Sequence, residues 1–456
     1  MNNYLADYFR CPDNYVHLAF QEENVGDVFP AQHKRGDAGH LTATSFPCEP
    51  VAPTGADLNN GAVCPLFVPA RLIDDLRLER YVADWRHFPP LSALAKIYYS
   101  LRPILPLVFR KHVQKWYLHD WDQLSFPHWP LDTTVDDLHR HLLLLSLRAS
   151  GAQRIPFIWF WPEGASSCAI MTHDVETTFG RDLCGMLMDI DDAHGIKSSF
   201  QFIPEQRYVT SQVFLDSIRS RGFEIVVHDL NHDGHLYRDR KQFLDRAAKI
   251  NAHGKRFGAQ GFRAGSLYRK QTWYDALDFA YDMSVPNVAH LDPQRGGCCT
   301  VMPYFIGKIL ELPVTTSQDY TLFNILDCDS INLWKQQIEL IMQKHGLMSF
   351  IAHPDYLATD SRRNLYAELL DCLVRLREEK NVWITTPSEV NHWWRQRAEL
   401  TLVADGDEWR IEGAGKEQAR IAYASENQGR LVFTFELQLS KELSCCNNAG
   451  LPRLRN

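Results

Sequence analysis

Short apolar runs alternate with longer amphipathic segments between Cys168 and Thr385, and this rhythm constrains the fold more than any other feature of the chain. An apolar run of strand length followed by a helix-length segment is typical of parallel strands joined by helices. No G-x-G-x-x-G pattern follows the first run, which disfavours a dinucleotide-binding open sheet. We therefore predict an α/β fold, a distorted (β/α) barrel of seven strands. The predicted strands are Cys168–Thr172, Ser198–Ile203, Glu224–His228, Gly261–Arg263, Ile309–Pro313, Met348–His353 and Val382–Thr385.

The chain before the barrel has a different character. Gln21–Gly61 is rich in turn-forming residues and lacks periodicity, which indicates loop. Prolines divide the helical pattern of Arg71–Leu147 into short helices. Within it, Leu101–Tyr117 could be an interfacial membrane helix or a helix that covers a core, and its two prolines favour the second interpretation. We expect residues 1–150 to form a loop-rich and helical N-terminal region.

After the barrel the pattern changes again. From about Glu399 the residues alternate with period two, and Asp405-Gly406 and Gln428-Gly429 supply turns between strands. We expect the barrel to occupy residues 151–397 and a small β appendage with a tail to occupy 398–456.

The composition of the chain indicates which binding partners and which cellular compartment to expect. Lys plus Arg number 48 and Asp plus Glu number 56, so the formal net charge of −8 disfavours nucleic acid as a partner. The 11 cysteines include no C-x-x-C pair, which favours reduced thiols in the cytoplasm. No apolar stretch approaches the roughly 20 residues of a membrane span, and the first residues contain no signal-peptide core. We expect a soluble cytoplasmic protein without a transmembrane segment; its oligomeric state stays open.

Residues able to bind a metal or move protons gather at three strand ends. The first strand runs into Thr172–Glu176, the third into His228–His235, and a late strand ends at His353. His228 and His232 are four residues apart, so a helical turn would place both imidazoles on one face. A carboxylate from another strand would then complete a three-ligand site with an open position for water.

Other polar and aromatic residues have simpler interpretations. His173 is expected to be a hydrogen-bonded core residue, and Cys298-Cys299 is expected to be structural. His235 could replace a ligand, but an outer contact is favoured. The run Trp159-Phe160-Trp161 could stack on sugar rings, although packing in the core is favoured. Trp393-Trp394 is expected to end the last barrel helix.

The order of these motifs resembles the NodB-type polysaccharide deacetylase family. The resemblance rests on Thr-x-Asp at the first strand, Gly-x-Glu-Ile before His-x-x-x-His, Phe-Arg-Ala-Gly, Asp-x-Ser and a late strand that ends in His, and it covers about Cys168 to Thr385. It implies a distorted (β/α) barrel, a divalent metal that is most often zinc, and removal of acetyl groups from N-acetylated sugars.

The resemblance also implies a role for individual residues. Asp174 matches the catalytic base and Arg263 the arginine that pairs with it. Asp282 matches the acidic residue that orients the catalytic histidine, and His353 matches that histidine. His228 and His232 match the metal ligands.

Three positions depart from the usual pattern of the family. Val175 stands where a second, metal-binding aspartate is expected, and Glu176 fits a variant in which that ligand lies one residue later. Gly265 replaces a proline, and Asp229 replaces Ser or Thr between the histidines.

These assignments imply a metal-dependent hydrolase that deacetylates an N-acetylated saccharide of a glycan or glycan precursor. Two alternatives remain: a hydrolase of a small non-sugar amide, and a non-catalytic barrel that keeps its metal and binds glycans. The presence of both Asp174 and His353 disfavours pure binding, which needs neither a base nor an acid.

Overall fold

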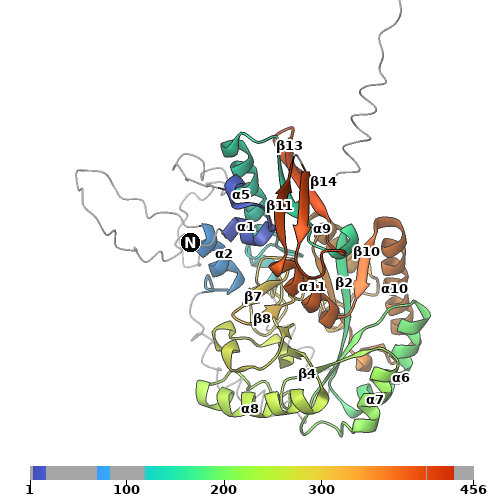
Figure 1. Ribbon diagram of the computed structural model, residues 1–456. Coiled ribbons are helices and arrows are strands. Elements are labelled where there is room, and N and C mark those ends of the chain that lie inside the picture. Colours follow the sequence, from blue (N-terminus) through green and yellow to red (C-terminus); the bar gives the residue numbers. More distant parts are fainter. Residues whose placement is uncertain (1–3, 17–68, 83–117, 119, 407, 436–456) are drawn as a thin grey trace, which may run out of the picture.

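The computed structural model describes residues 4–16, 69–82, 118, 120–406 and 408–435 (Figure 1). The predicted loop Gln21–Gly61 and the predicted helix Leu101–Tyr117 lie outside these residues. Where the chain is described, strands and helices alternate along the barrel region, which confirms the predicted α/β class.

The large sheet has nine strands among the described residues. Seven of them, from β9 through β2, β3, β4, β5 and β6 to β8, are parallel neighbours in that order. Its strands are β2 (Ser167–Val175), β3 (Ser199–Phe202), β4 (Glu224–His228), β5 (Gly261–Arg263), β6 (Tyr281–Asp282), β7 (Tyr304–Ile306), β8 (Ile309–Glu311), β9 (Leu347–Ile351) and β10 (Val382–Thr385). The predicted seven-stranded barrel is confirmed, with one exchange of strand.

That exchange concerns the predicted strand Val382–Thr385. This segment forms β10, which pairs only with Ser167–Ile170 of β2. From Thr172 onward, the same edge of β2 pairs with β3 instead. The seventh strand of the barrel is β6. It has only two residues, which are too few to form a recognisable strand pattern in the sequence.

Side chains close the barrel where no backbone ladder joins β8 to β9. Just beyond β8, the Thr315 hydroxyl donates to the Leu347 carbonyl (2.7 Å) and accepts from the Ser349 amide (2.9 Å). The Thr316 hydroxyl donates to the Ser349 carbonyl (2.7 Å). We call these three hydrogen bonds the threonine seam.

Helices cover the outside of the sheet (Figure 1). Alternate residues of β2 separate two cores: Ala169 and Met171 pack toward the outer helices, whereas Cys168 and Ile170 face the interior. Side-chain caps begin four of the helices, at Thr177, Ser211, Asp239 and Thr359. The barrel-region helices are α6 (Thr178–Ala193), α7 (Gln212–Ser220), α8 (Arg240–Phe257), α9 (Asn332–Gln343), α10 (Asp360–Lys380) and α11 (Pro387–Glu399).

A strand that precedes the barrel and two strands from the C-terminal region form one three-stranded sheet. β1 (Arg154–Ile158) pairs antiparallel with β13 (Ile421–Asn427), and β13 pairs with β14 (Arg430–Phe435). The predicted β appendage is therefore continuous with a strand that precedes the barrel. The predicted turns are present, since Gly406 and Gly429 both have positive φ. The remaining elements are the helices α1 (Tyr4–Phe9), α2 (Pro69–Arg77) and α5 (Thr134–Ser150), the hairpin β11 (Thr401–Asp405) and β12 (Glu408–Glu412), and the short helical turns η1 (Asp13–Tyr15), η4 (Trp121–Gln123), η5 (Pro162–Gly164), η6 (Gly265–Leu267), η7 (Gln271–Ala276), η8 (Thr321–Ile325) and η9 (Pro354–Leu357).

Buried aromatic residues fill the amino end of the barrel. Trp159, Phe160 and Trp161 are at most 3% exposed, and they share one apolar cluster with the interior residues Ile170 and Val226. The alternative that this run stacks on sugars is therefore wrong, and the predicted core role is confirmed. Because this end is filled, the carboxyl ends of the strands are left for function.

A buried ion pair ties the N-terminal region to the barrel. The Glu79 carboxylate accepts hydrogen bonds from Arg269 Nε (2.7 Å) and from the Gly297 amide (2.7 Å), and both charged side chains are fully buried. Removing one partner would leave the other charge buried and uncompensated. We expect Glu79→Gln to lower the free energy of unfolding by about 3–5 kcal/mol in urea denaturation.

A matched control is Lys335→Met, which removes a 3.0 Å pair with Glu368 whose side chains are 40% and 49% exposed. This variant should barely move the transition, because exposed pairs are screened by water. Equal effects of the two variants would contradict the prediction.

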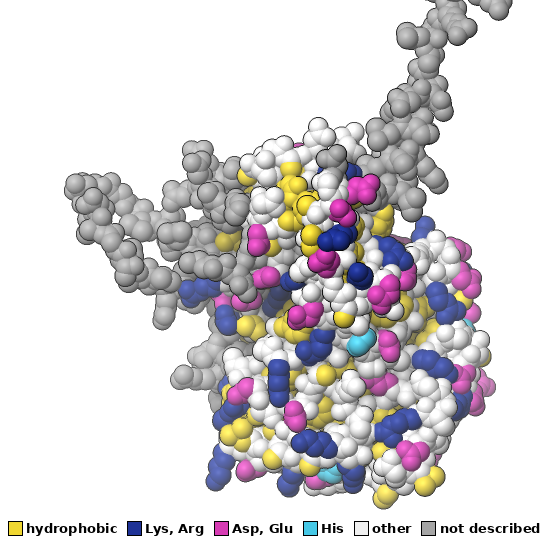
Figure 2. All heavy atoms as spheres, viewed as in Figure 1, with side chains coloured by type: hydrophobic (Ala, Val, Ile, Leu, Met, Phe, Trp, Pro, Cys, Tyr) yellow, Lys and Arg dark blue, Asp and Glu magenta, His cyan; other side chains and the backbone are white. Residues whose placement is uncertain are grey.

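Within the described residues no helix has the length and hydropathy required to cross a bilayer. On the face shown in Figure 2, acidic and basic side chains are interspersed and do not form a patch of one sign.

Candidate metal and acid–base site

Six of the seven predicted site residues meet at the carboxyl end of the barrel. Asp174 is the penultimate residue of β2, His228 ends β4, and Arg263 ends β5. Val175 is fully buried in the outer core, so Asp174 and Glu176 leave the strand on the other side.

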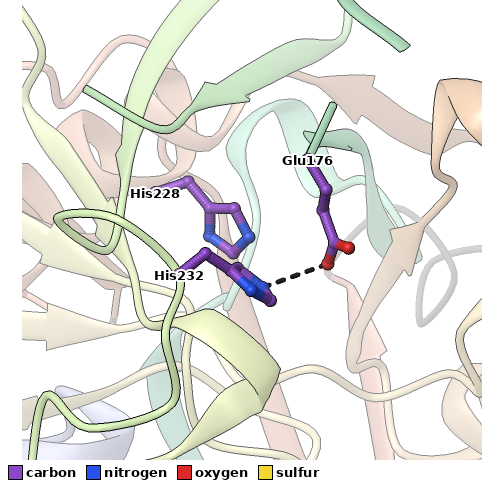
Figure 3. A group of neighbouring side chains, drawn as sticks. All are labelled: Glu176, His228 and His232. Carbon is purple, nitrogen blue, oxygen red and sulfur yellow. Dashed lines mark ion pairs between the residues drawn. The ribbon is translucent and has the colours of Figure 1, made fainter. Parts of the chain in front are cut away.

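Glu176, His228 and His232 form a cluster with the geometry of a metal site (Figure 3). One ligand atom from each residue lies within 4.8 Å of the others, and His232 Nε2 is 3.1 Å from Glu176 Oε1. The Nε2 atoms of both histidines are buried and receive no well-directed hydrogen bond. His228 Nδ1 lies 3.1 Å from the Arg263 carbonyl, which favours a proton on Nδ1 and a lone pair on Nε2. Two imidazole nitrogens and a carboxylate can hold a divalent cation.

The segment between the two histidines is a loop and not a helical turn, so the two imidazoles meet in another way. Asp229 and His232 both adopt positive φ, at 55° and 54°. Contacts from neighbouring loops hold this conformation: the Asp229 amide donates to the Arg263 carbonyl (2.8 Å), and Arg207 donates to the carbonyls of Asn231 (3.1 Å) and His232 (2.7 Å). The imidazoles therefore converge through backbone strain at a functional position.

Gly265 allows this loop to pack closely. A Cβ at this position would lie 2.6 Å from Asp229 Oδ2 and 2.9 Å from His232 Cδ2. Only glycine leaves room for the histidine, which gives a local physical reason for the departure at this position.

Asp174 forms a buried ion pair with Arg263. Arg263 Nη1 donates to Asp174 Oδ1 (2.6 Å) and to the Thr172 hydroxyl (2.8 Å), while its Nε donates to the Met283 carbonyl (3.0 Å). Burial alone would raise the pKa of Asp174, but the guanidinium and the nearby His228 lower it below the usual value. Asp174 is thus held ionised, with Oδ2 3.8 Å from His228 Nε2.

His353 is paired with Asp319, and the predicted pairing with Asp282 is wrong. Asp319 accepts from the His353 backbone amide (2.7 Å) and lies 2.6 Å from His353 Nδ1. Burial alone would lower the pKa of His353, but the Asp319 carboxylate raises it to about 10. His353 Nε2 is 3.7 Å from Glu176 Oε1, so a protonated imidazole borders the metal cluster.

Asp282 belongs to a different structural feature. It accepts hydrogen bonds from the Ser284 amide (2.8 Å), the Ser284 hydroxyl (3.0 Å) and the Tyr274 hydroxyl (3.1 Å). It stands opposite Glu311 across the β6–β8 pairing, and burial raises the pKa of both carboxyls. This pair lies in the barrel wall, where Glu311 also accepts a hydrogen bond from the Val285 amide (2.9 Å).

The sequence interpretation missed Asp319 because it lies in the loop after β8, beyond any strand-length pattern. The usable signal was an acidic residue shortly after the strand predicted at Ile309–Pro313.

The remaining candidates have ordinary roles in the structure. His173 is buried, with its ring nitrogens 3.0 Å from the Ala352 carbonyl and 3.2 Å from Asp191. The side chain of His235 is 49% exposed and pairs with Asp233, away from the cluster. Cys298 and Cys299 are fully buried free thiols.

No family model and no curated protein matches the chain. Among solved structures, it is similar to a presumed polysaccharide deacetylase of Mycobacterium smegmatis, with 16% identity and a TM-score of 0.42 over 54% of this chain and 96% of that one. It is also similar to the Puue allantoinase, with 13% identity and a TM-score of 0.41 over 52% and 92% of the two chains. A third is a family 4 acetyl xylan esterase of Clostridium thermocellum in complex with a cobalt ion, with 14% identity and a TM-score of 0.33 over 50% and 91%.

Proposed function

We propose that this protein is a metal-dependent hydrolase that removes the acetyl group from an N-acetylated sugar. One observation carries the proposal. The ionised carboxylate of Asp174 lies within 4 Å of His228, and the protonated imidazole of His353 lies within 4 Å of Glu176, so both groups border the three-residue metal cluster. Amide hydrolysis needs these components, because a water must lose a proton and the departing nitrogen must gain one.

The cation would be held by Glu176, His228 and His232, and zinc suits this mixed nitrogen and oxygen donor set. When bound, it supplies Lewis acidity toward the amide carbonyl and lowers the pKa of water. Burial lowers the pKa of His228, so this imidazole is neutral and available as a ligand near neutral pH.

The chain's own residues then divide the proton transfers. Asp174, kept ionised by Arg263, accepts the proton of the attacking water. His353, kept protonated by Asp319, donates a proton to the sugar nitrogen as the C–N bond breaks. Arg263 also fixes the orientation of the base, because it donates to Asp174 while Thr172 and Met283 hold its guanidinium in place.

The N-acetylated saccharide is supported by the order of sequence motifs. The positioned base and acid disfavour the alternative of a glycan-binding barrel without turnover. We further propose a reducing, cytoplasmic location, supported by seven free cysteines among the described residues.

Acetate release from the zinc-loaded protein tests the function. We expect turnover with an N-acetyl saccharide panel and little with a panel of small non-sugar amides. The reverse preference would support the small-amide hydrolase, and no release from either panel would contradict hydrolysis.

Metal content gives a separate prediction. The purified protein should carry about one zinc-class ion per chain, and the His228→Ala, His232→Ala double variant should lose it, because two of three ligands are gone. Elemental analysis measures this. His235→Ala is the matched control and should keep the ion; unchanged metal content in the double variant would show that the site is wrong.

A further inference from the structure

A buried histidine stands directly before the proposed base, and the proton transfers described above do not use it. His173 precedes Asp174 on β2, and its side chain is fully buried. The ring packs against Phe200 of β3, with ring centroids 4.8 Å apart. A buried imidazole needs a partner for each of its two nitrogens, so the partners of His173 reveal what this residue holds in place.

A buried network fixes one side of the His173 ring. Nε2 lies 3.2 Å from Asp191 Oδ2 of α6, and this oxygen also accepts a hydrogen bond from the Ser198 hydroxyl (2.6 Å). The other oxygen of Asp191 accepts from the Tyr366 hydroxyl of α10 (2.6 Å). All four side chains are at most 1% exposed. A buried network with every member hydrogen-bonded is rigid, so the ring keeps one orientation.

The other nitrogen of His173 holds the peptide bond that precedes the proposed acid. Nδ1 donates to the Ala352 carbonyl (3.0 Å), and the N–H of the same peptide, which belongs to His353, donates to Asp319 (2.7 Å). Because a peptide bond is planar, contacts at its carbonyl and at its N–H together fix its position and its tilt. The Ala352 amide also donates to the Thr172 carbonyl (3.0 Å).

The backbone ladders of the sheet do not extend to His353. The pairing of β2 with β9 ends at Thr172 and Ile351, two residues before His353. On the other side of β9, the threonine seam replaces a ladder. The position of His353 therefore depends on side-chain contacts, and His173 is the side chain that supplies one from β2.

We infer that His173 is a positioning residue for the reaction, which sets the place of His353 relative to Asp174 and the metal cluster. Two consecutive residues of β2 then carry the base and anchor the acid, so one strand fixes the spacing of both groups. The inference rests on the proposed function and deepens it, because it assigns the residue that aligns the proton donor. It does not require His173 to touch the substrate.

Two substitutions separate the roles of the two nitrogens. The amide of Asn can take the place of Nδ1 and keep the hydrogen bond to Ala352, whereas the amide of Gln reaches the place of Nε2 and keeps only the contact with Asp191. In the zinc-loaded protein, we expect His173→Asn to release acetate from the N-acetyl saccharide panel with a kcat near the parental value. His173→Gln should lower kcat by about 10- to 100-fold with KM and metal content unchanged, because a misplaced donor slows proton transfer without weakening binding.

His139 of α5 provides the matched control. It is also fully buried with both ring nitrogens in contact with partners, at 2.8 Å from the Val135 carbonyl and 2.7 Å from the Tyr4 hydroxyl, but these partners belong to the N-terminal region. His139→Gln should lower stability and keep the parental kcat. Equal kcat values for His173→Asn and His173→Gln would overturn the inference. A fall in His139→Gln as large as that in His173→Gln would overturn it too, because the loss would then follow any such change of a buried histidine.

Crystal structures of the zinc-loaded parent and variants give a readout that does not depend on turnover. The distance from His353 Nε2 to Glu176 Oε1, which is 3.7 Å in this structure, should match the parental value in His173→Asn and change by about 1 Å in His173→Gln. If the parent releases no acetate, the proposed function fails, and this distance alone decides the positioning role: an equal distance in both variants overturns it. If His173→Gln does not fold, His173→Leu, which lacks both donors, takes its place with the same expected results.

Discussion

Replacing Asp174 with Asn should lower acetate release by about 10²- to 10⁴-fold while the protein keeps its metal. The amide cannot accept the proton of the attacking water, but Asp174 is not a member of the Glu176, His228 and His232 cluster. Glu176→Ala should instead lose metal affinity as well as activity, because it removes one of three ligands.

Metal titration of both purified variants, followed by acetate release, measures the difference. The two carboxylates are only two residues apart, so each variant controls for the general effect of removing a negative charge at this strand end. Loss of the ion by Asp174→Asn together with its retention by Glu176→Ala would mean that base and ligand are exchanged.

His353→Gln should lower turnover by a similar factor of about 10²- to 10⁴-fold, because the leaving nitrogen loses its proton donor. The pH profile carries more information. Asp319 raises the pKa of His353 to about 10, so the parent should stay active into the alkaline range and lose activity only as rising pH deprotonates His353. Asp319→Asn removes the stabilising carboxylate, so the alkaline limb should move to lower pH.

Asp282→Asn is the control for this experiment. It also removes a buried carboxyl near the strand ends, but Asp282 bonds to Ser284 and Tyr274 rather than to His353. Its alkaline limb should stay at the parental pH. A shift in Asp282→Asn without one in Asp319→Asn would show that the pairing seen here does not govern the acid.

The polar residues at the ends of the longer strands could be predicted from the sequence. β2, β4 and β9 each have at least five residues, and a polar residue follows or ends each apolar run. Such a pattern is visible without tertiary information, which is why Asp174, His228 and His353 could be located from the sequence.

The parts that could not be predicted depend on contacts between distant segments. β6 has two residues and pairs only because β5 and β8 flank it. The positive φ of His232 could not be predicted from the type of residue at that position. Contacts with Gly265 and Arg207, which lie in other loops, stabilise this backbone conformation. Asp319 was missed for the same reason, since its importance comes from His353, 34 residues further along the chain.

The threonine seam has a consequence for redesign of this protein. A backbone ladder locks the spacing and register of two strands, whereas the seam joins β8 to β9 through the hydroxyls of Thr315 and Thr316. The same two segments lead to Asp319 and to His353. We therefore expect substitution of these threonines to change the spacing between His353 and Asp319 while the backbone ladders that join β2, β3 and β4 stay intact.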